Sequence, residues 1–161
     1  MTEDLEPTSR VRLAAAERGL DVVVRPRPDA SSLDEAAALL GLETDDIVKT
    51  LVVKRSDDTY LFALVPGDRV ISWPKLRALV GVNKLRLPEP ELALAATGYE
   101  RGTIVPIGST HDWPVFADSS IVGRRIAMGA GAQGYSLFVD ADALIAAYGA
   151  TVADITEQRS R

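Results

Sequence analysis

Two apolar segments rich in β-branched residues, 47–54 and 59–65, are separated only by the four residues RSDD, and this pair constrains the fold most. Parallel strands need a crossover of a dozen or more residues, whereas antiparallel strands can be joined by a short turn. The two segments are therefore predicted to form a β-hairpin, and a sheet that contains it cannot be purely parallel.

The elements predicted around this hairpin do not alternate regularly as β-α-β units. Helices are expected over 9–18, from Ser32 to Gly41, over 73–80, from Pro88 to Gly98 and over 140–149. Strands are expected over 21–25 and 83–87, and 99–139 is Gly-rich with a β-like pattern in GTIVPIG, PVFAD, RRIAMG and YSLFV. This order favours an α+β fold, a curled mixed or antiparallel sheet that is barrel-like, with surrounding helices. With 161 residues, we expect a loose tail at 1–8 and a single domain over 9–158.

Composition excludes several classes of site. The chain has no cysteine and a single histidine, and it lacks the spacings of zinc sites, so we expect no metal site. No apolar run reaches the roughly 18 residues of a membrane span, and the acidic start MTEDLEPTSR has no apolar signal segment. A cytoplasmic protein that does not contact membranes is the expectation.

Charge is distributed unevenly along the chain. The net charge of −5 argues against a broad basic surface for DNA or other nucleic acids. Residues 49–101, however, carry nine basic and six acidic side chains. This basic middle third is interpreted either as an ordinary solvated surface or as a small phosphate-contacting patch.

Lys49 interrupts the first strand of the hairpin. Because side chains alternate across a strand, Lys49 is predicted to share a face with Ile47, Leu51 and Val53, all of which are apolar. A charge on such a face is costly unless it is paired or reaches water. Either the lysine stem lies on apolar surface while its ammonium reaches solvent, or the face is the wall of a pocket where the ammonium meets a ligand.

Two glycine-containing segments are further candidates. GTIVPIGST (102–110) has the spacing G-x-x-x-P, and such a loop can present backbone N–H groups to an oxyanion. GAGAQG (129–134) matches the dinucleotide-binding pattern, but the β-like YSLFVD follows it where that site needs a helix. A strand–loop–strand with close backbone access is the better interpretation.

A catalytic triad is the last candidate. His111 could be combined with Ser109 or Ser119 and with Asp112. No nucleophile elbow is present, so an exposed loop histidine is the preferred interpretation.

Several of these features occur together in one known family. IVKTLVVK, VPGDRVI, NKLRLPEPELALAATGYERGTIVPIG, PVFADSSI and IAMGAGAQGYSLFVDADALIAAYGATVADIT resemble the YbaK/prolyl-tRNA synthetase-associated editing domains. The resemblance extends from about residue 20 to the end of the chain. It implies hydrolysis of the ester that joins a wrong amino acid to the 3′ end of a tRNA, without metal or organic cofactor.

The resemblance also implies site residues. Lys49 matches the essential strand lysine, and Gly102 belongs to the loop expected to act on the reacting carbonyl. The substrate-binding candidates are Thr50, Pro106, Ser119, Gly129, Ala130, Gly131, Gln133 and Gly134. Many relatives carry histidine where this chain has Gln133, so an imidazole role cannot be transferred here.

The function expected from this resemblance is trans-editing. The substrate would be tRNA, with tRNA-Pro favoured, that carries Cys, Ala, Ser or Thr, and prolyl-tRNA synthetase is a possible partner. Two alternatives stay open at this point. One is a non-catalytic module that binds aminoacyl-tRNA or a synthetase, and the other is a hydrolase of small amino-acid esters or amides.

Overall fold

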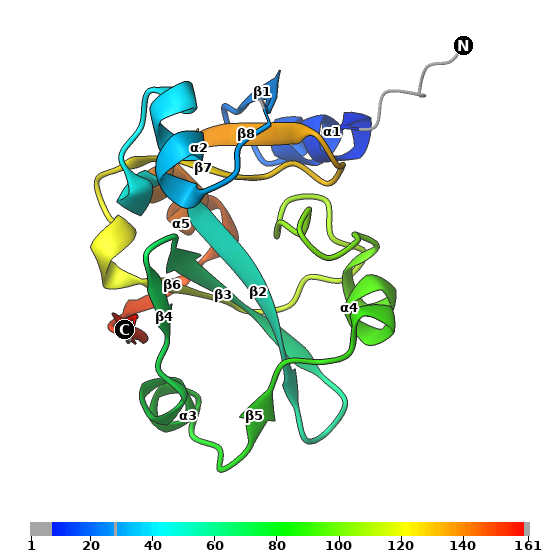
Figure 1. Ribbon diagram of the computed structural model, residues 1–161. Helices are drawn as coiled ribbons and strands as arrows, with labels where there is room; N and C mark the ends of the chain where they lie inside the picture. Colours follow the sequence, from blue (N-terminus) through cyan, green and yellow to red (C-terminus); the bar gives the residue numbers. More distant parts are fainter. Residues whose placement is uncertain (1–7, 28, 160–161) are drawn as a thin grey trace.

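Figure 1 shows the computed structural model, which describes residues 8–27 and 29–159. Within these residues, helices and strands follow one another in an irregular order, as expected for an α+β protein. The helices are α1 (Ser9–Glu17), α2 (Leu33–Leu40), α3 (Trp73–Val80), α4 (Pro90–Thr97) and α5 (Ala141–Tyr148). The strands are β1 (Val23–Pro26), β2 (Val48–Arg55), β3 (Tyr60–Pro66), β4 (Arg69–Ile71), β5 (Leu85–Arg86), β6 (Val115–Asp118), β7 (Arg125–Gly129), β8 (Tyr135–Asp140), β9 (Thr151–Ala153) and β10 (Thr156–Gln158).

The predicted hairpin is confirmed and forms the centre of the largest sheet. β2 and β3 pair antiparallel from Val48 opposite Pro66 to Lys54 opposite Tyr60. The strand order is β5-β2-β3-β6-β9, and the β3–β6 and β6–β9 pairs are parallel, so the sheet is mixed. β1, β8 and β7 form a second, antiparallel sheet, and β4 pairs with β10.

The predicted curl does not extend to a closed barrel among the described strands. Within residues 8–27 and 29–159, only an isolated bridge between Ile47 and Ala127 joins the largest sheet to the β1-β8-β7 sheet. In Figure 1, β2 runs from the β7–β8 end of the molecule to β5 at the other end. β5 pairs only with Lys54 and Arg55, so between Val48 and Val53 the edge of β2 opposite β3 has no partner among the described strands.

The two faces of the β2–β3 hairpin pack against different cores. Val48, Val52, Phe62 and Leu64 belong to the larger core, which also includes side chains of α1, α4, α5, β7 and β8. Alternate residues such as Val53 belong to a smaller core with α3 and the C-terminal segment. Both strand faces are thus largely covered, which explains the nearly continuous apolar sequence of β3.

One predicted β-like segment, 102–108, is a loop instead. Pro106 has no backbone N–H, and Gly102 and Gly108 adopt positive φ angles of 90° and 80°, so a regular ladder cannot form. Its apolar residues fill the core without joining a sheet: Val105 and Ile107 are fully buried.

The helix boundaries follow the predicted signals closely. The Ser32 side chain accepts a hydrogen bond from the Glu35 N–H at 3.0 Å, but the Glu35 carboxylate accepts from Ser31 rather than from the Ser32 N–H, so Ser32 and Glu35 form only half of a capping box. Gly41 ends α2 with a left-handed conformation. The predicted tail at 1–8 falls almost entirely outside the described residues.

Candidate functional site

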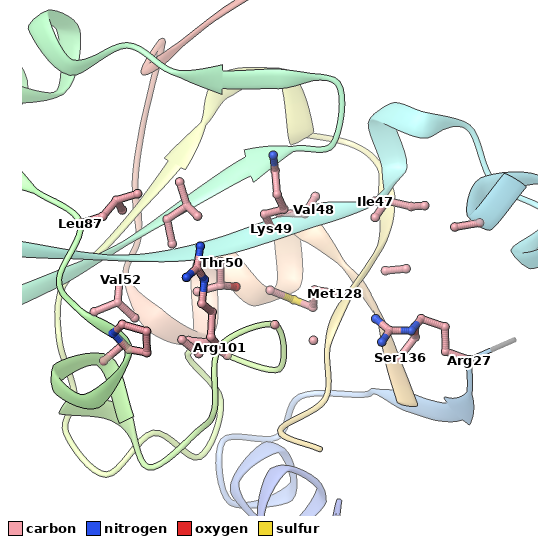
Figure 2. Close-up of a pocket in the computed structure, with 18 of the residues that line it drawn as sticks. Arg27, Ile47, Val48, Lys49, Thr50, Val52, Leu87, Arg101, Met128 and Ser136 are labelled. Atoms are coloured by element: carbon pink, nitrogen blue, oxygen red, sulfur yellow. The ribbon is translucent and has the colours of Figure 1, made fainter. Parts of the chain in front are cut away.

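A pocket of about 490 Å³ lies where the open edge of β2 faces β7 and the loop after α4. β2 provides one wall, and the end of β7 and the 101–104 segment provide the opposite one (Figure 2). α2 and the segment before α4 complete the enclosure. The lining residues are Arg27, Ala36, Leu40, Ile47, Val48, Lys49, Thr50, Leu51, Val52, Leu87, Pro88, Pro90, Ala93, Arg101, Gly102, Ile104, Ala127, Met128, Gly129 and Ser136.

All charged side chains that line this pocket are cationic. They are Arg27, Lys49 and Arg101, and no Asp, Glu or His is among the described residues of the lining. None of the three side chains forms a hydrogen bond or ion pair with a described residue. Unpaired cations around a largely apolar cavity favour an anionic ligand.

Lys49 lines the pocket from the start of β2. Lys49 alternates with Leu51 and Val53 as expected, but it lies near the start of β2 and its side chain is exposed. In Figure 2 its ammonium points to the side of β2 opposite the Thr50 hydroxyl. Partial burial lowers the pKa of the ammonium, and the positive charge of Arg159 lowers it further.

Thr50 and Arg101 face the interior of the pocket from opposite walls (Figure 2). The Thr50 hydroxyl is buried and has no hydrogen-bond partner among the described residues. An unsatisfied buried hydroxyl costs about 1–3 kcal/mol, so a polar group from a ligand would find a ready partner here. Ser136, from β8, adds a further hydroxyl to the lining.

The loop and the Gly-rich turn that the sequence singled out lie against one another. The Gly131 N–H donates to the Thr103 carbonyl at 2.9 Å. A Cβ atom on Gly129 would lie 2.8 Å from the carbonyl oxygens of both Thr103 and Ile104, so only glycine allows this approach. The N–H groups of Gly102 and Ile104 donate to no described residue, which leaves two backbone donors in the pocket wall.

Tyr99 holds the loop 102–108 through a hydrogen bond to its backbone. Its buried hydroxyl donates to the Ile107 carbonyl at 2.8 Å, and burial raises its pKa to about 12. Gly131 adopts a φ of 83°, and a Cβ there would lie 2.8 Å from the Tyr99 ring. The conformation of the loop is thus determined by Tyr99 and by the Gly-rich turn.

The structure gathers only part of the predicted site residues in the pocket. Lys49, Thr50, Gly102 and Gly129 line it. Pro106 and Ala130 are buried, and neither they nor Gly131 are among the lining residues. Gln133 and Gly134 lie in the β7–β8 turn outside the lining, and Ser119 is in the short helix Ser119–Ile121.

Arg27, Arg101 and Ser136 are pocket residues that the sequence analysis did not assign to the site. Arg101 directly precedes Gly102, so its basic charge beside the G-x-x-x-P loop was a usable signal. Arg27 and Ser136 reach the pocket because β1 pairs with β8, with Arg25 opposite Ser136. No local sequence pattern predicts the pairing of β1 with β8.

The alternative sites considered from sequence are not assembled. His111 stacks on Trp113, and its Nδ1 lies 3.2 Å from the Ala96 carbonyl oxygen. Ser109 reaches only the backbone N–H of His111, so no serine–histidine–aspartate relay is formed. The GAGAQG segment is the turn of the β7–β8 hairpin, as interpreted above.

Residues 8–27 and 29–159 contain neither a cluster of metal ligands nor a membrane-spanning helix. No group of three or more His, Cys, Asp or Glu side chains in these residues is placed to hold a metal ion. None of the helices in this part of the chain is long and apolar enough to cross a membrane.

The fold and the pocket define an α+β domain with a cation-lined cavity bordered by a glycine-supported loop. The chain belongs to the aminoacyl-tRNA editing domain family, whose sequence profile matches residues 27–147. It is therefore related to the editing domains of proline–tRNA ligases, as the sequence resemblance predicted.

Individual relatives agree with this assignment. The chain is 41% identical over 112 residues to the proline–tRNA ligase of Shouchella clausii, and 39% identical over 98 residues to that of Nitratidesulfovibrio vulgaris. These matches cover 69% and 61% of this chain but only 19% and 17% of the ligases.

Two solved structures match this chain over nearly their whole length. A crystal structure described as that of a proposed trans-editing enzyme for prolyl tRNA synthetase superposes with a TM-score of 0.84 at 30% identity, covering 94% of this chain and 98% of that one. The crystal structure of hypothetical protein APE2540 gives a TM-score of 0.83 at 28% identity, covering 92% and 99%.

Proposed function

We propose that this protein is an aminoacyl-tRNA deacylase that removes a small, wrongly attached amino acid from tRNA in trans. The observation that carries the proposal is the pocket whose charged lining side chains are all cationic and unpaired among the described residues. The 3′ end of a charged tRNA presents phosphates and an uncharged ester, and it has no negative charge on the amino acid. Such a ligand suits a cation-lined, otherwise apolar cavity.

The loop that contains Gly102 supplies electrostatic stabilisation. A water oxygen attacks the ester carbonyl carbon, and the negative charge that develops on the carbonyl oxygen is accepted by the free N–H groups of Gly102 and Ile104. The bond between the carbonyl carbon and the ribose oxygen then breaks. The ribose oxygen takes up a proton, and the free amino acid leaves.

The described lining offers no carboxylate or imidazole that could act as general base. The base is therefore assigned to the substrate, through the neighbouring ribose hydroxyl. This assignment also explains how an exchange of histidine for Gln133 is compatible with activity, since Gln133 lies in the exposed turn and not in the lining.

Lys49 and the two arginines hold the nucleotide. The β2 edge is open at Lys49, so its four-carbon stem can lie across the edge and bring the ammonium to a phosphate or to the reacting carbonyl. Arg101 approaches from the opposite wall (Figure 2), and Arg27 lies at the β8 side. The Thr50 hydroxyl completes the polar contacts.

The relationship to proline–tRNA ligases supports a proposal for the substrate class. We assign Cys, Ala, Ser or Thr attached to tRNA-Pro as substrates, prolyl-tRNA synthetase as the enzyme whose errors are corrected, and the cytoplasm as the compartment. The test is a deacylation panel with these four amino acids on tRNA-Pro and on their own tRNAs. Release from none of them by the purified protein would contradict the proposal.

The absence of a protein base among the described lining residues favours one rival, a module that binds aminoacyl-tRNA without hydrolysing it. The number of amino acids released per protein molecule distinguishes the deacylase from the binding module. A deacylase releases many equivalents of amino acid per protein molecule, whereas a binding module protects the ester and slows its spontaneous hydrolysis.

A further inference from the structure

A second hollow of about 400 Å³ lies at the other end of β2, around β5 and the end of α3. It is separate from the pocket described above, and the two have no lining residue in common. Its lining residues are Lys54, Arg55, Ser56, Arg77, Asn83, Lys84, Leu85 and Arg86. Five of these eight residues are basic in a protein whose net charge is −5.

Three of the five cations have acidic neighbours. Lys54 forms an ion pair with Asp58 at 2.9 Å, Arg86 lies 3.5 Å from Glu89, and the charge of Arg55 lowers the pKa of Asp57 after the larger effect of its hydrogen bonds with Thr59. The two ion pairs therefore offset part of the positive charge of the hollow.

Arg55, Arg77 and Lys84 are the cations of the hollow whose side chains form no ion pair with a described residue. The charge of Arg55 acts on the Asp57 carboxylate, whereas Arg77 and Lys84 have no such partner among these acidic neighbours. Neither side chain forms a hydrogen bond or ion pair with any described residue. Lys84 is exposed and Arg77 is half-buried at the last turn of α3. The Arg77 and Lys84 side chains are therefore available to a ligand.

We propose that this hollow binds backbone phosphates of an RNA duplex, the stem that leads to the single-stranded end held in the first pocket. The inference rests on the proposed function and adds a separate contact surface to it. Unpaired cations without aromatic side chains in the lining suit phosphates, because stacking of bases requires aromatic platforms.

The positions of the two hollows fit this division of the ligand. Thr50 in the first pocket and Arg55 in the second are five residues apart on β2, which corresponds to about 17 Å along a strand. The segment 85–88 links the hollows a second time, since Leu85 and Arg86 line one and Leu87 and Pro88 the other. A few unpaired nucleotides can span this distance between the terminal ester and the first duplex phosphates.

The binding test uses the double variant Arg77→Gln/Lys84→Gln and an uncharged RNA hairpin with a single-stranded 3′ CCA end. We expect the slope of log affinity against log salt to decrease by about two, because each substitution removes one phosphate-binding cation. At 50 mM salt the variant should bind about tenfold more weakly than wild type. Arg125→Gln, which removes one exposed cation outside both hollows, is the matched control and should leave the slope unchanged.

A deacylation test distinguishes the duplex contact from damage to the first pocket. With mischarged full-length tRNA, the double variant should show a raised KM and an unchanged kcat. With a short mischarged single-stranded fragment that ends in CCA, wild type and variant should be equal. An unchanged hairpin slope, or an equal decrease in activity on the short fragment, would overturn the inference.

Failure of the proposed function would look different. Suppose that wild type hydrolyses no mischarged tRNA while the salt slope of RNA-hairpin binding still depends on Arg77 and Lys84. That result would support the phosphate-binding surface and contradict the deacylase assignment. If a single-stranded RNA of equal length binds with the same variant-sensitive slope, the assignment to a duplex is wrong.

Discussion

Lys49 is the residue on which the proposed chemistry depends most. Its ammonium has no ion pair with a described residue, and its side chain is exposed. Lys49→Ala should therefore change the free energy of unfolding by no more than about 0.5 kcal/mol, as is usual at exposed sites. Deacylation should be abolished in the same variant, because the ammonium that binds the substrate is removed.

The measurement for Lys49→Ala pairs a denaturant melt with a deacylation assay. Lys49→Arg is the matched control, since it keeps the charge but not the compact ammonium. Full activity of Lys49→Ala, or a folded state that collapses, would contradict the role given to this lysine.

The titration of Lys49 provides a second prediction. Its folded-state pKa is lowered, so between that pKa and the higher unfolded-state value the unfolded chain binds more protons, and this residue's contribution to stability increases with pH across that window. Arg159→Gln removes one cause of the lowering and should raise the pKa of Lys49. NMR titration of the lysine side chain measures this, and a pKa that is unchanged or falls would contradict the electrostatic coupling.

Thr50 carries a buried hydroxyl without a partner among the described residues, which leads to a third prediction. Thr50→Val keeps the side-chain shape and removes the unsatisfied group, so the protein should become more stable by about 1 kcal/mol. If the hydroxyl binds substrate, kcat/KM should fall by about tenfold, the value of one hydrogen bond. A decrease in stability together with unchanged activity would show that the hydroxyl serves the fold.

At the scale of single residues, sequence reasoning identified the glycines and the lysine better than the arginines. Gly129 is required because a Cβ there would lie 2.8 Å from the Thr103 and Ile104 carbonyl oxygens, and a Gly-rich pattern is typical of such close backbone approaches. Lys49 was identified because it interrupts an apolar alternation, although the structure shows its side chain exposed. Arg27 enters the pocket only through the pairing of β1 with β8, which no local pattern encodes.

At the scale of elements, the site depends on the contact between the loop 101–108 and the end of β7. This contact combines the hydrogen bond from Gly131 to Thr103 with the absence of a side chain at Gly129. The sequence predicted that both segments belong to one site through the family resemblance, but it predicted a β-like conformation for the loop. Gly102, Gly108 and Pro106 prevent that conformation, and the loop is held by Tyr99 instead.

Gly129→Ala tests this contact. Gly129 is not in the left-handed region, so alanine adds no backbone strain and acts only through its Cβ, which would push against the Thr103 and Ile104 carbonyls. Overpacking of this kind costs about 1–3 kcal/mol of folding free energy. Displacement of the loop should lower kcat more than it raises KM, because the donors to the transition state move.

Gly123→Ala is the control for Gly129→Ala, because it replaces a glycine away from the loop. Gly123 has a positive φ of 82° but lies outside the pocket lining. The substitution should lower stability with little change in kcat. If Gly129→Ala changes stability alone, the loop has no part in catalysis.

At the scale of the whole molecule, an acidic chain concentrates unpaired cations in two hollows at opposite ends of β2. The basic middle third of the sequence contains most of these cations but left a solvated surface and a phosphate-contacting patch open, whereas the helices and the hairpin were predicted because their signals are local. The parallel pairing of β3, β6 and β9 and the pairing of β4 with β10 join segments far apart in the chain. Short strands of three or four residues carry too little pattern of their own to reveal such partners.

The central claim is that this domain hydrolyses the ester of mischarged tRNA, and multiple-turnover release of amino acid tests it most directly. With tRNA-Pro that carries alanine in large excess over protein, we predict that wild type releases many equivalents of alanine, while correctly charged tRNA-Pro stays intact. Lys49→Ala should release alanine no faster than buffer. Protection of the ester by wild type, or equal hydrolysis by wild type and Lys49→Ala, would contradict the account.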